Sequence, residues 1–165
     1  MRVVDAREES SLIIEVESPE EMDRLGAALA EIAAPGAVIG LVGPLGSGKT
    51  RLTRALAVGL GADERAVSSP TFTLIQEYDG RIPISHFDTY RLPSVRAFED
   101  LGPWDYLGGE GICVIEWSDR VASILPANTW TITITPTGET RRQVHLALPV
   151  PEQLALRSRL LTDQV

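Results

Sequence analysis

GPLGSGKT, residues Gly43 to Thr50, is the stretch that decides the fold of this 165-residue chain. It follows the P-loop pattern of Gly, four residues and Gly-Lys-Thr, in which backbone N–H groups and one lysine hold phosphate groups. The short apolar run AVIGLV (37–42) precedes it, and RLTRALAVGLG, from Arg51, follows with apolar residues at helical spacing. A strand, a Gly-rich loop and a helix in this order predict a site for a nucleoside triphosphate.

Lys49 is the only lysine of the chain, and the other basic residues are all arginine. A compact ammonium group on a flexible stem suits the β- and γ-phosphates, whereas a planar guanidinium does not fit there. We therefore expect a catalytic role for Lys49, and we expect Thr50 to place its hydroxyl on Mg²⁺. The predicted nucleotide-binding residues of this stretch are Gly43, Leu45, Gly46, Ser47, Gly48, Lys49, Thr50 and Arg51.

Length and composition predict that the P-loop belongs to a single domain over residues 1–165, with 44% hydrophobic residues and a net charge of −8. Such an acidic chain is a poor nonspecific binder of a polyphosphate backbone. The single cysteine, Cys113, lies in the apolar run ICVI, so we expect a buried, inert thiol and a reducing compartment. No apolar run approaches the ~20 residues that span a bilayer, and the N-terminus has no signal-peptide pattern. The expected location is the cytoplasm, without membrane contact.

The remaining patterns predict a three-layer α/β, P-loop NTPase-like fold with a mixed, mostly parallel central sheet. Ser18 is placed to cap a helix that has Pro at its first position and an acidic first turn. The other predicted elements are a strand over Ser11–Glu17, two strands within 68–92 joined at Asp79-Gly80, short helical pieces over 94–111, a buried strand over Gly111–Trp117, a late hairpin turning near Thr137–Glu139, and a C-terminal amphipathic helix.

Two carboxylates stand at the ends of predicted strands, where a P-loop site needs an acid for its metal and a group that positions water. Glu116 follows GICVI, and Asp88 follows IPISHF. The alternative for each is an acid that faces water. His86 is placed to share a face with Asp88, and a structural, hydrogen-bonded histidine is the favoured interpretation, because no His/Cys set for a metal exists.

The segment SSPTFT, residues 68–73, lies where many P-loop proteins keep a nucleotide-sensing switch, although a simple loop remains an alternative. Trp117 is either core filler or a contact surface. A GTPase is disfavoured, because its Asn-Lys-x-Asp motif is absent. The residues favour a minimal ATPase over a small-molecule phosphotransferase, whose arginine lid would have to use Arg91 and Arg96, or a nucleotide-dependent binding module without catalysis.

Four motifs in this order resemble the TsaE (YjeE) family over roughly residues 15 to 145: GPLGSGKT, SPTFT (69–73), HFDTYRL (86–92) and EW (116–117). The resemblance implies an ATPase that uses ATP and Mg²⁺. In that family the protein acts with TsaD and TsaB to form the N6-threonylcarbamoyl group on the adenosine next to the anticodon of certain tRNAs. Contact with tRNA would then be indirect, through partner proteins, which agrees with the acidic charge.

The resemblance also assigns roles by position. It implies that Lys49 and Thr50 serve phosphate and Mg²⁺, that Glu116 is the metal-linked acid, and that Asp88 and Thr71 act in hydrolysis and switching. It further implies two contacts with the nucleotide, from the start of the first helix near Ser18 and from an arginine of the late hairpin, with Arg141 as the candidate and Arg142 as the alternative. The sequence departs from the family at Pro44, where an acid is usual, and at Arg51, where a second Thr or Ser is common.

Overall fold

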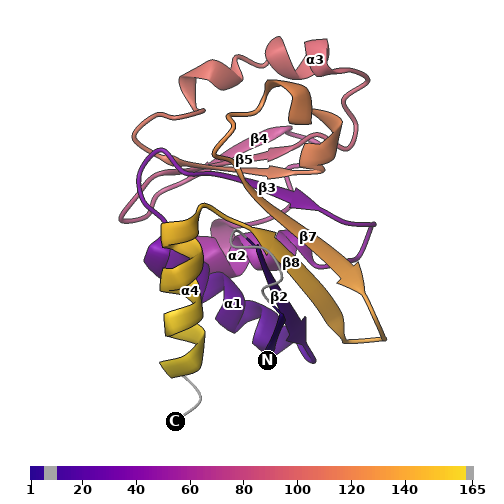
Figure 1. Ribbon diagram of the computed structural model, residues 1–165. Coiled ribbons are helices and arrows are strands. Elements are labelled where there is room, and N and C mark those ends of the chain that lie inside the picture. The colour runs from indigo at the N-terminus through magenta and orange to yellow at the C-terminus, as the bar shows by residue number, and fades with distance from the viewer. Residues whose placement is uncertain (6–10, 163–165) are drawn as a thin grey trace.

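One mixed sheet runs through the computed structural model, which describes residues 1–5 and 11–162 (Figure 1). Its strand order is β1-β2-β8-β7-β3-β6-β5-β4. The four central strands are mutually parallel: β7 (Trp130–Pro136), β3 (Val38–Val42), β6 (Ile112–Glu116) and β5 (Ile84–Asp88). Antiparallel strands flank this centre: β4 (Ile75–Tyr78) on one side, and β8 (Arg142–Ala147), β2 (Ser11–Val16) and β1 (Arg2–Asp5) on the other. The predicted mixed sheet with a parallel centre is confirmed.

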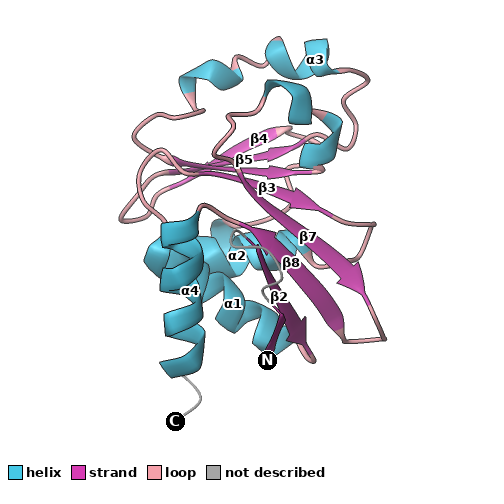
Figure 2. Cartoon of the chain, in the orientation of Figure 1, coloured by secondary structure: helices cyan, strands magenta, loops and turns pink. Residues whose placement is uncertain are grey.

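Helices cover both faces of this sheet and make it the middle of three layers (Figure 2). The helices α1 (Pro19–Ile32), α2 (Lys49–Gly59) and α4 (Val150–Thr162) lie on one face. The short helix α3 (Val95–Glu99) and several 3-10 turns lie on the other. Each face has its own apolar cluster, because the central strands are buried on both sides. The three-layer P-loop NTPase-like fold is therefore confirmed.

The start of α1 carries the expected cap. The Ser18 hydroxyl accepts a hydrogen bond from the backbone N–H of Glu21 at 3.3 Å. The Glu21 carboxylate in turn accepts from the N–H of Glu17 at 2.8 Å, one residue earlier than in a standard capping box. Further along α1, a Cβ at Gly26 would stand 2.5 Å from the Cβ of Ala55, so glycine lets α1 and α2 approach closely. This packing fixes α1 beside the helix that follows the P-loop.

Three local features differ from the sequence-based expectation. Strand β1 was not predicted, because its four residues carry charge at both ends and gain their place only by pairing with β2. Residues 68–74 lie outside β4, since Leu74 has a φ of +67° and its N–H donates to the carbonyl of Pro70. The connection from β4 to β5 runs from Asp79 to Pro83 and is longer than a two-residue turn, although the two strands do form the predicted antiparallel pair.

The thiol of Cys113 is buried in β6, and burial raises its pKa to about 12. A thiol that stays protonated at neutral pH is a poor nucleophile, so the expected inert, buried cysteine is confirmed. None of the described helices combines the length and the apolar character needed to cross a membrane.

Candidate nucleotide-binding site

The P-loop connects the end of β3 to the first residue of α2, and its glycines adopt backbone angles that other residues avoid. The φ angles are +151° at Gly43, +75° at Gly46 and +114° at Gly48. A Cβ on Gly43 would also lie 2.5 Å from the carbonyl oxygen of Ile134 on β7. The loop therefore depends on glycine, and it delivers the N-terminus of α2, the positive end of the helix dipole, to the site.

The side chain of Lys49 folds back against the P-loop and contacts its first two residues. It is only 4% exposed, and its Nζ donates to the carbonyl oxygens of Gly43 at 2.7 Å and Pro44 at 2.9 Å. The same Nζ lies 3.8 Å from the centroid of the Trp117 ring. Burial lowers the pKa of Lys49, while the carboxylates of Glu116 and Asp88 oppose that effect. The ammonium group is thus held between the loop, an aromatic face and two acids.

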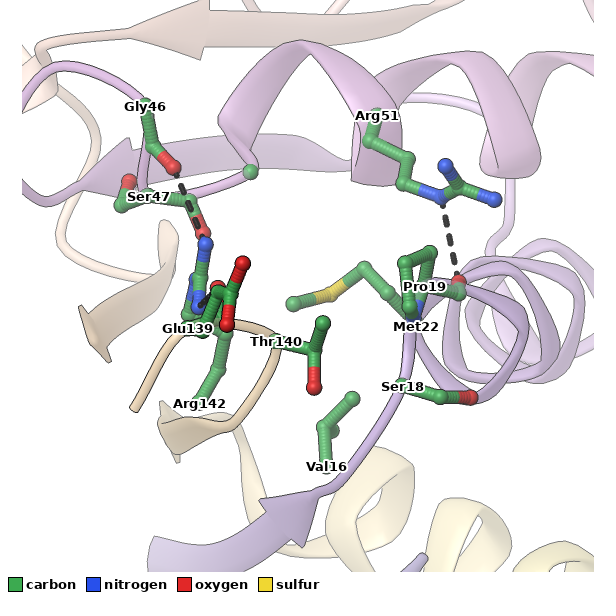
Figure 3. A pocket seen from close by; sticks show the side chains of 11 residues that line it. Val16, Ser18, Pro19, Met22, Gly46, Ser47, Arg51, Glu139, Thr140 and Arg142 are labelled. Carbon is green, nitrogen blue, oxygen red and sulfur yellow. Dashed lines mark hydrogen bonds between the residues drawn. The ribbon is translucent and has the colours of Figure 1, made fainter. Parts of the chain in front are cut away.

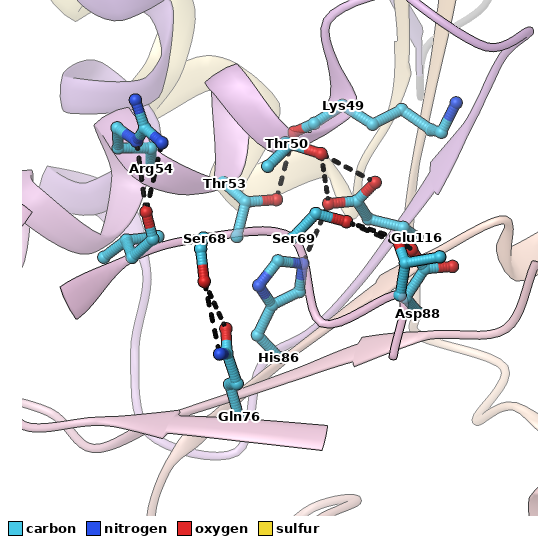
Figure 4. A network of polar contacts seen from close by, with 12 residues as sticks. Lys49, Thr50, Thr53, Arg54, Ser68, Ser69, Gln76, His86, Asp88 and Glu116 are labelled. Atoms are coloured by element: carbon cyan, nitrogen blue, oxygen red, sulfur yellow. Dashed lines mark hydrogen bonds and ion pairs between the residues drawn. The ribbon is translucent and has the colours of Figure 1, made fainter. Parts of the chain in front are cut away.

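Thr50 and Glu116 form the second part of the site (Figure 4). The Thr50 hydroxyl donates to the Glu116 carboxylate, with Oγ1 at 2.9 Å from Oε1 and 3.1 Å from Oε2. Glu116 is the last residue of β6 and only 3% exposed. The structure thus places this acid against the first turn of α2 and not in water, and it brings the two predicted metal-linked residues into direct contact.

Asp88 and the 68–73 loop form the third part. Asp88 ends β5, beside Glu116 in the sheet register. Its Oδ2 accepts from the hydroxyls of Thr71 at 2.8 Å and Ser69 at 3.3 Å, while its Oδ1 accepts from the N–H of Tyr90 at 2.9 Å. The hydroxyl groups of Ser69 and Thr71 therefore lie in the site beside Asp88, where a switch segment would place them.

His86 lies two residues before Asp88 on β5, and both side chains reach the same group of polar residues (Figure 4). It is completely buried, and its Nε2 lies 2.9 Å from Oε1 of Glu116. Among the described residues, no group of three or more His, Cys, Asp or Glu is arranged to hold a metal by itself. The interpretation of His86 as a structural, hydrogen-bonded residue agrees with these contacts.

These parts enclose one cleft of about 390 Å³. It opens between the P-loop, the 68–73 loop and the carboxyl ends of β5 and β6. At its rim, Leu45 is 80% exposed and Phe72 is 83% exposed, with the Arg91 guanidinium 4.3 Å from the Phe72 ring centroid. The lining residues are Leu45, Gly46, Gly48, Lys49, Thr50, Arg51, Ser69, Thr71, Asp88, Tyr90, Arg91, Glu116 and Trp117.

A second pocket, of about 240 Å³, lies on the other side of the P-loop, between the start of α1 and the β7–β8 hairpin (Figure 3). Arg142 joins the hairpin to the loop, because its Nε donates to the carbonyl of Ser47 at 2.9 Å. Arg141, which precedes β8, does not line this pocket. The lining residues are Val16, Ser18, Pro19, Met22, Gly46, Ser47, Gly48, Arg51, Glu139, Thr140 and Arg142.

The structure shows what the two residues that depart from the family pattern contact. Pro44 offers its carbonyl oxygen to Lys49, a backbone contact that does not depend on the side chain at this position. Arg51 turns away from the P-loop, and its Nε donates to Asp23 of α1 at 2.8 Å and to the carbonyl of Pro19 at 3.1 Å. It therefore braces α1 against α2 while it lines both the cleft and the second pocket.

Fold and site together define the class of P-loop NTPase-like proteins. The family model described as threonylcarbamoyl adenosine biosynthesis protein TsaE matches residues 16–144. Proteins named tRNA threonylcarbamoyladenosine biosynthesis protein TsaE are similar to the chain. The one from Treponema pallidum is 41% identical over 79% of this chain and 96% of its own length, and the one from Bacillus subtilis is 41% identical over 77% and 79%.

A solved structure agrees with these sequence comparisons. The crystal structure of Bacillus subtilis YdiB has a TM-score of 0.74 and 32% sequence identity, and the match covers 93% of this chain and 96% of that one. The chain belongs to the TsaE family of tRNA threonylcarbamoyladenosine biosynthesis.

Proposed function

We propose that the chain is a Mg²⁺-dependent ATPase that acts with TsaD-like and TsaB-like proteins in forming the N6-threonylcarbamoyl group on the adenosine next to the anticodon of tRNA. One observation carries this proposal. A single cleft gathers the P-loop lysine, the Thr50–Glu116 pair and the Asp88–Thr71 pair. These are the phosphate, metal and water-positioning groups that P-loop hydrolysis needs.

Thr50 and Glu116 are the residues that would hold Mg²⁺. The ion prefers oxygen ligands and usually takes only one or two of them from protein, with phosphate oxygens and water as the rest. A hydroxyl and a carboxylate already in contact at the helix N-terminus fit that requirement. When bound, the ion neutralises charge that develops on the phosphate oxygens.

Lys49, Asp88 and the loop hydroxyls would have separate roles in ATP hydrolysis. Lys49 brings a buried positive charge to the phosphates, where the low local dielectric strengthens its effect. Asp88 stands where an acid would orient the attacking water, and the loop hydroxyls of Thr71 and Ser69 that it holds are placed to respond to the γ-phosphate. Hydrolysis then depends on the position of the 68–73 loop, which gives partner proteins a point of control.

The second pocket is where we place the base and ribose. The apolar side chains of Val16 and Met22 offer a surface for a flat ring, and Ser18 and Arg142 offer polar groups. Because Arg142 lines the pocket and Arg141 does not, Arg142 takes the place of Arg141 as the nucleotide-contacting arginine in this proposal. Both pockets adjoin Gly46 and Gly48, so one nucleotide bound across the P-loop would occupy both.

The proposed partners follow from family and charge together. A chain with a net charge of −8 is a poor ligand for tRNA itself, so tRNA contact would pass through the TsaD-like and TsaB-like proteins of the cytoplasm. A pull-down from the native host with and without ATP tests this. Recovery of both partners supports the proposal, and recovery of neither contradicts it.

Release of labelled γ-phosphate tests the reaction. We expect Mg²⁺-dependent inorganic phosphate, formed slowly by the chain alone and at a different rate with the partners. Label that appears on a small metabolite would instead show a phosphotransferase. ATP binding without phosphate release, even with the partners present, would show a nucleotide-dependent binding module.

A further inference from the structure

A buried chain of side chains connects Glu116 to the beginning of the 68–73 loop. The imidazole of His86 contacts Glu116 through Nε2 at 2.9 Å and the hydroxyl of Tyr78 through Nδ1, also at 2.9 Å. The Tyr78 hydroxyl lies 3.1 Å from the carbonyl oxygen of Ser68 and 2.8 Å from Oε1 of Gln76. His86 is fully buried and Tyr78 is 5% exposed, so water does not replace these contacts.

In the hydrogen bonds between Glu116, His86 and Tyr78, the chemistry of the groups limits which atom can donate and which can accept. A carboxylate only accepts hydrogen bonds, so Nε2 of His86 carries the proton that it shares with Glu116. With the Thr50 hydroxyl as its other donor, the Glu116 side chain is held in one orientation. Partners that orient a metal-ligating group in this way typically change metal affinity when they are removed.

The Tyr78 hydroxyl links the hydrogen bonding of His86 and Glu116 to the position of the 68–73 loop. Burial raises the pKa of Tyr78 to about 12, so the phenol keeps its one proton at neutral pH. That proton can serve only one acceptor at a time, and three are within reach: the Ser68 carbonyl, Oε1 of Gln76 and Nδ1 of His86. Gln76 is itself hydrogen-bonded to the Ser68 hydroxyl, so movement of Ser68 changes two of these acceptors and shifts the proton toward His86. The position of the loop therefore changes the hydrogen bonding of the group that holds Glu116.

The loop is also tied to the neighbouring part of β5. Asp88 holds the hydroxyls of Ser69 and Thr71, and its own N–H donates to the carbonyl of Leu74. His86 and Asp88 thus bind the two ends of one segment, the first through Tyr78 and the second directly. A change in the loop reaches both strand-end acids by separate routes.

We propose that Tyr78 and His86 are positioning residues that couple the metal-linked acid Glu116 to the 68–73 loop, so that Mg²⁺-nucleotide binding and ordering of the loop favour each other. This rests on the proposed function, because it takes Glu116 as the acid of the Mg²⁺ site. The coupling is reciprocal by thermodynamic linkage: whatever Mg²⁺-nucleotide does to the loop, the loop does to Mg²⁺-nucleotide affinity.

Three variants separate the contact of Tyr78 with the loop from the contact of His86 with Glu116. Tyr78→Phe keeps the ring and removes the hydroxyl that reaches Ser68. His86→Leu removes both contacts, whereas His86→Gln keeps an N–H donor for Glu116 and loses the Nδ1 acceptor. Tyr106→Phe is the matched control, because Tyr106 packs against Phe87 on the opposite face of the sheet.

Two measurements are made on each variant of the full chain. Binding of a fluorescent ADP analogue is titrated with Mg²⁺, and backbone hydrogen exchange is followed at residues 68–74 with and without Mg²⁺-ADP. We expect His86→Leu to need about 10-fold more Mg²⁺ while its Mg²⁺-free affinity stays unchanged, and His86→Gln to restore the wild-type titration. We expect Tyr78→Phe to speed exchange at 68–74 in the free protein and to weaken its slowing by Mg²⁺-ADP. The control should match wild type in both measurements.

The proposal is overturned if Tyr78→Phe exchanges at 68–74 like wild type, or if the Mg²⁺ titrations of His86→Leu and wild type superimpose. If His86→Leu does not fold, the exchange of Tyr78→Phe at 68–74, without and with Mg²⁺-ADP, still decides the matter. A wild-type chain that binds ADP without any Mg²⁺ dependence would contradict the proposed function instead. Hydrogen exchange of the nucleotide-free Tyr78→Phe variant needs no ligand, so it tests the contact between Tyr78 and the 68–73 loop even if the proposed function is wrong.

Discussion

Glu116 and Asp88 are alike in sequence context and different in their surroundings. Each ends a central parallel strand, each is 3% exposed, and they are paired in the register of β5 and β6. Glu116 is held by the first turn of α2 and by a buried imidazole on the central strand β5. Asp88 is held largely by hydroxyls of a loop in which Ser69 is exposed and Thr71 is half-buried. We infer that two similar acids serve a fixed metal site and a movable catalytic one.

Loss of Lys49 should have the largest effect, because its ammonium group interacts with both acids. We expect Lys49→Ala to weaken ATP binding or hydrolysis by about 100-fold or more, since it removes a preorganised charge from the phosphate site. Nucleotide titration and phosphate release measure this. Lys49→Arg keeps the charge and should still fail, because the guanidinium does not fit the loop. Normal hydrolysis by Lys49→Arg would mean that the lone lysine reflects composition only.

Asp88→Asn should come next, and it should affect hydrolysis rather than binding. We expect a loss of about 100-fold in the hydrolysis rate, the lower end of what a positioned acid or base contributes. The amide keeps the shape of the side chain, so ATP affinity should remain within about threefold of wild type, which is under 1 kcal/mol. Single-turnover hydrolysis together with equilibrium binding checks this split. Equal losses in hydrolysis rate and in ATP affinity would show that Asp88 supports nucleotide binding. Asp88 and Glu116 would then not differ in the way proposed.

The loop hydroxyls should rank by their distance from Asp88. Thr71→Ala removes the 2.8 Å contact and Ser69→Ala the 3.3 Å contact, so Thr71→Ala should slow hydrolysis more. We expect about 10-fold for Thr71→Ala, the value of one hydrogen bond to a charged group, and less for Ser69→Ala. Thr71→Ser retains the hydroxyl and serves as the control. The reverse order of the two alanine variants would rule out the proposed geometry of the loop.

The smallest effect should come from the hairpin arginines, which lie away from both acids. Arg142→Ala loses its contacts with the P-loop and should weaken ADP affinity by about fivefold. Arg141→Ala should leave ADP affinity unchanged, because Arg141 is outside the pocket. Calorimetry of ADP binding compares the two. A larger loss for Arg141→Ala would make Arg141 the nucleotide-contacting arginine after all.

Much of the fold could be predicted from the sequence because its signals are local. The P-loop, the cap at Ser18 and the apolar runs of β3 and β6 each follow from a few neighbouring residues. Strand β1 could not be predicted, since its four residues acquire their structure by pairing with β2. The positive φ at Leu74 likewise depends on hydrogen bonds to residues elsewhere in the loop and on β5.

In the site, too, some features follow from local sequence and others from contacts between distant residues. Residue type and spacing were enough to predict that Lys49, Thr50, Glu116 and Asp88 share one cleft, since parallel strands bring their carboxyl ends to one edge of a sheet. The choice between Arg141 and Arg142 depends on how the hairpin turns, which local sequence does not define. The role proposed for Tyr78 depends on a contact with the backbone of Ser68 in the loop before β4, so no sequence pattern indicated it.

In the proposed site, Glu116 supports Mg²⁺ binding and Asp88 supports the hydrolytic step. The most direct test is a Mg²⁺ titration of ATP hydrolysis by wild type, Glu116→Gln and Asp88→Asn under the same conditions. We predict that Glu116→Gln shifts the half-saturating Mg²⁺ concentration upward by about 10-fold or more, while Asp88→Asn lowers the plateau and leaves the midpoint in place. A shifted midpoint for Asp88→Asn with an unshifted one for Glu116→Gln would contradict the account.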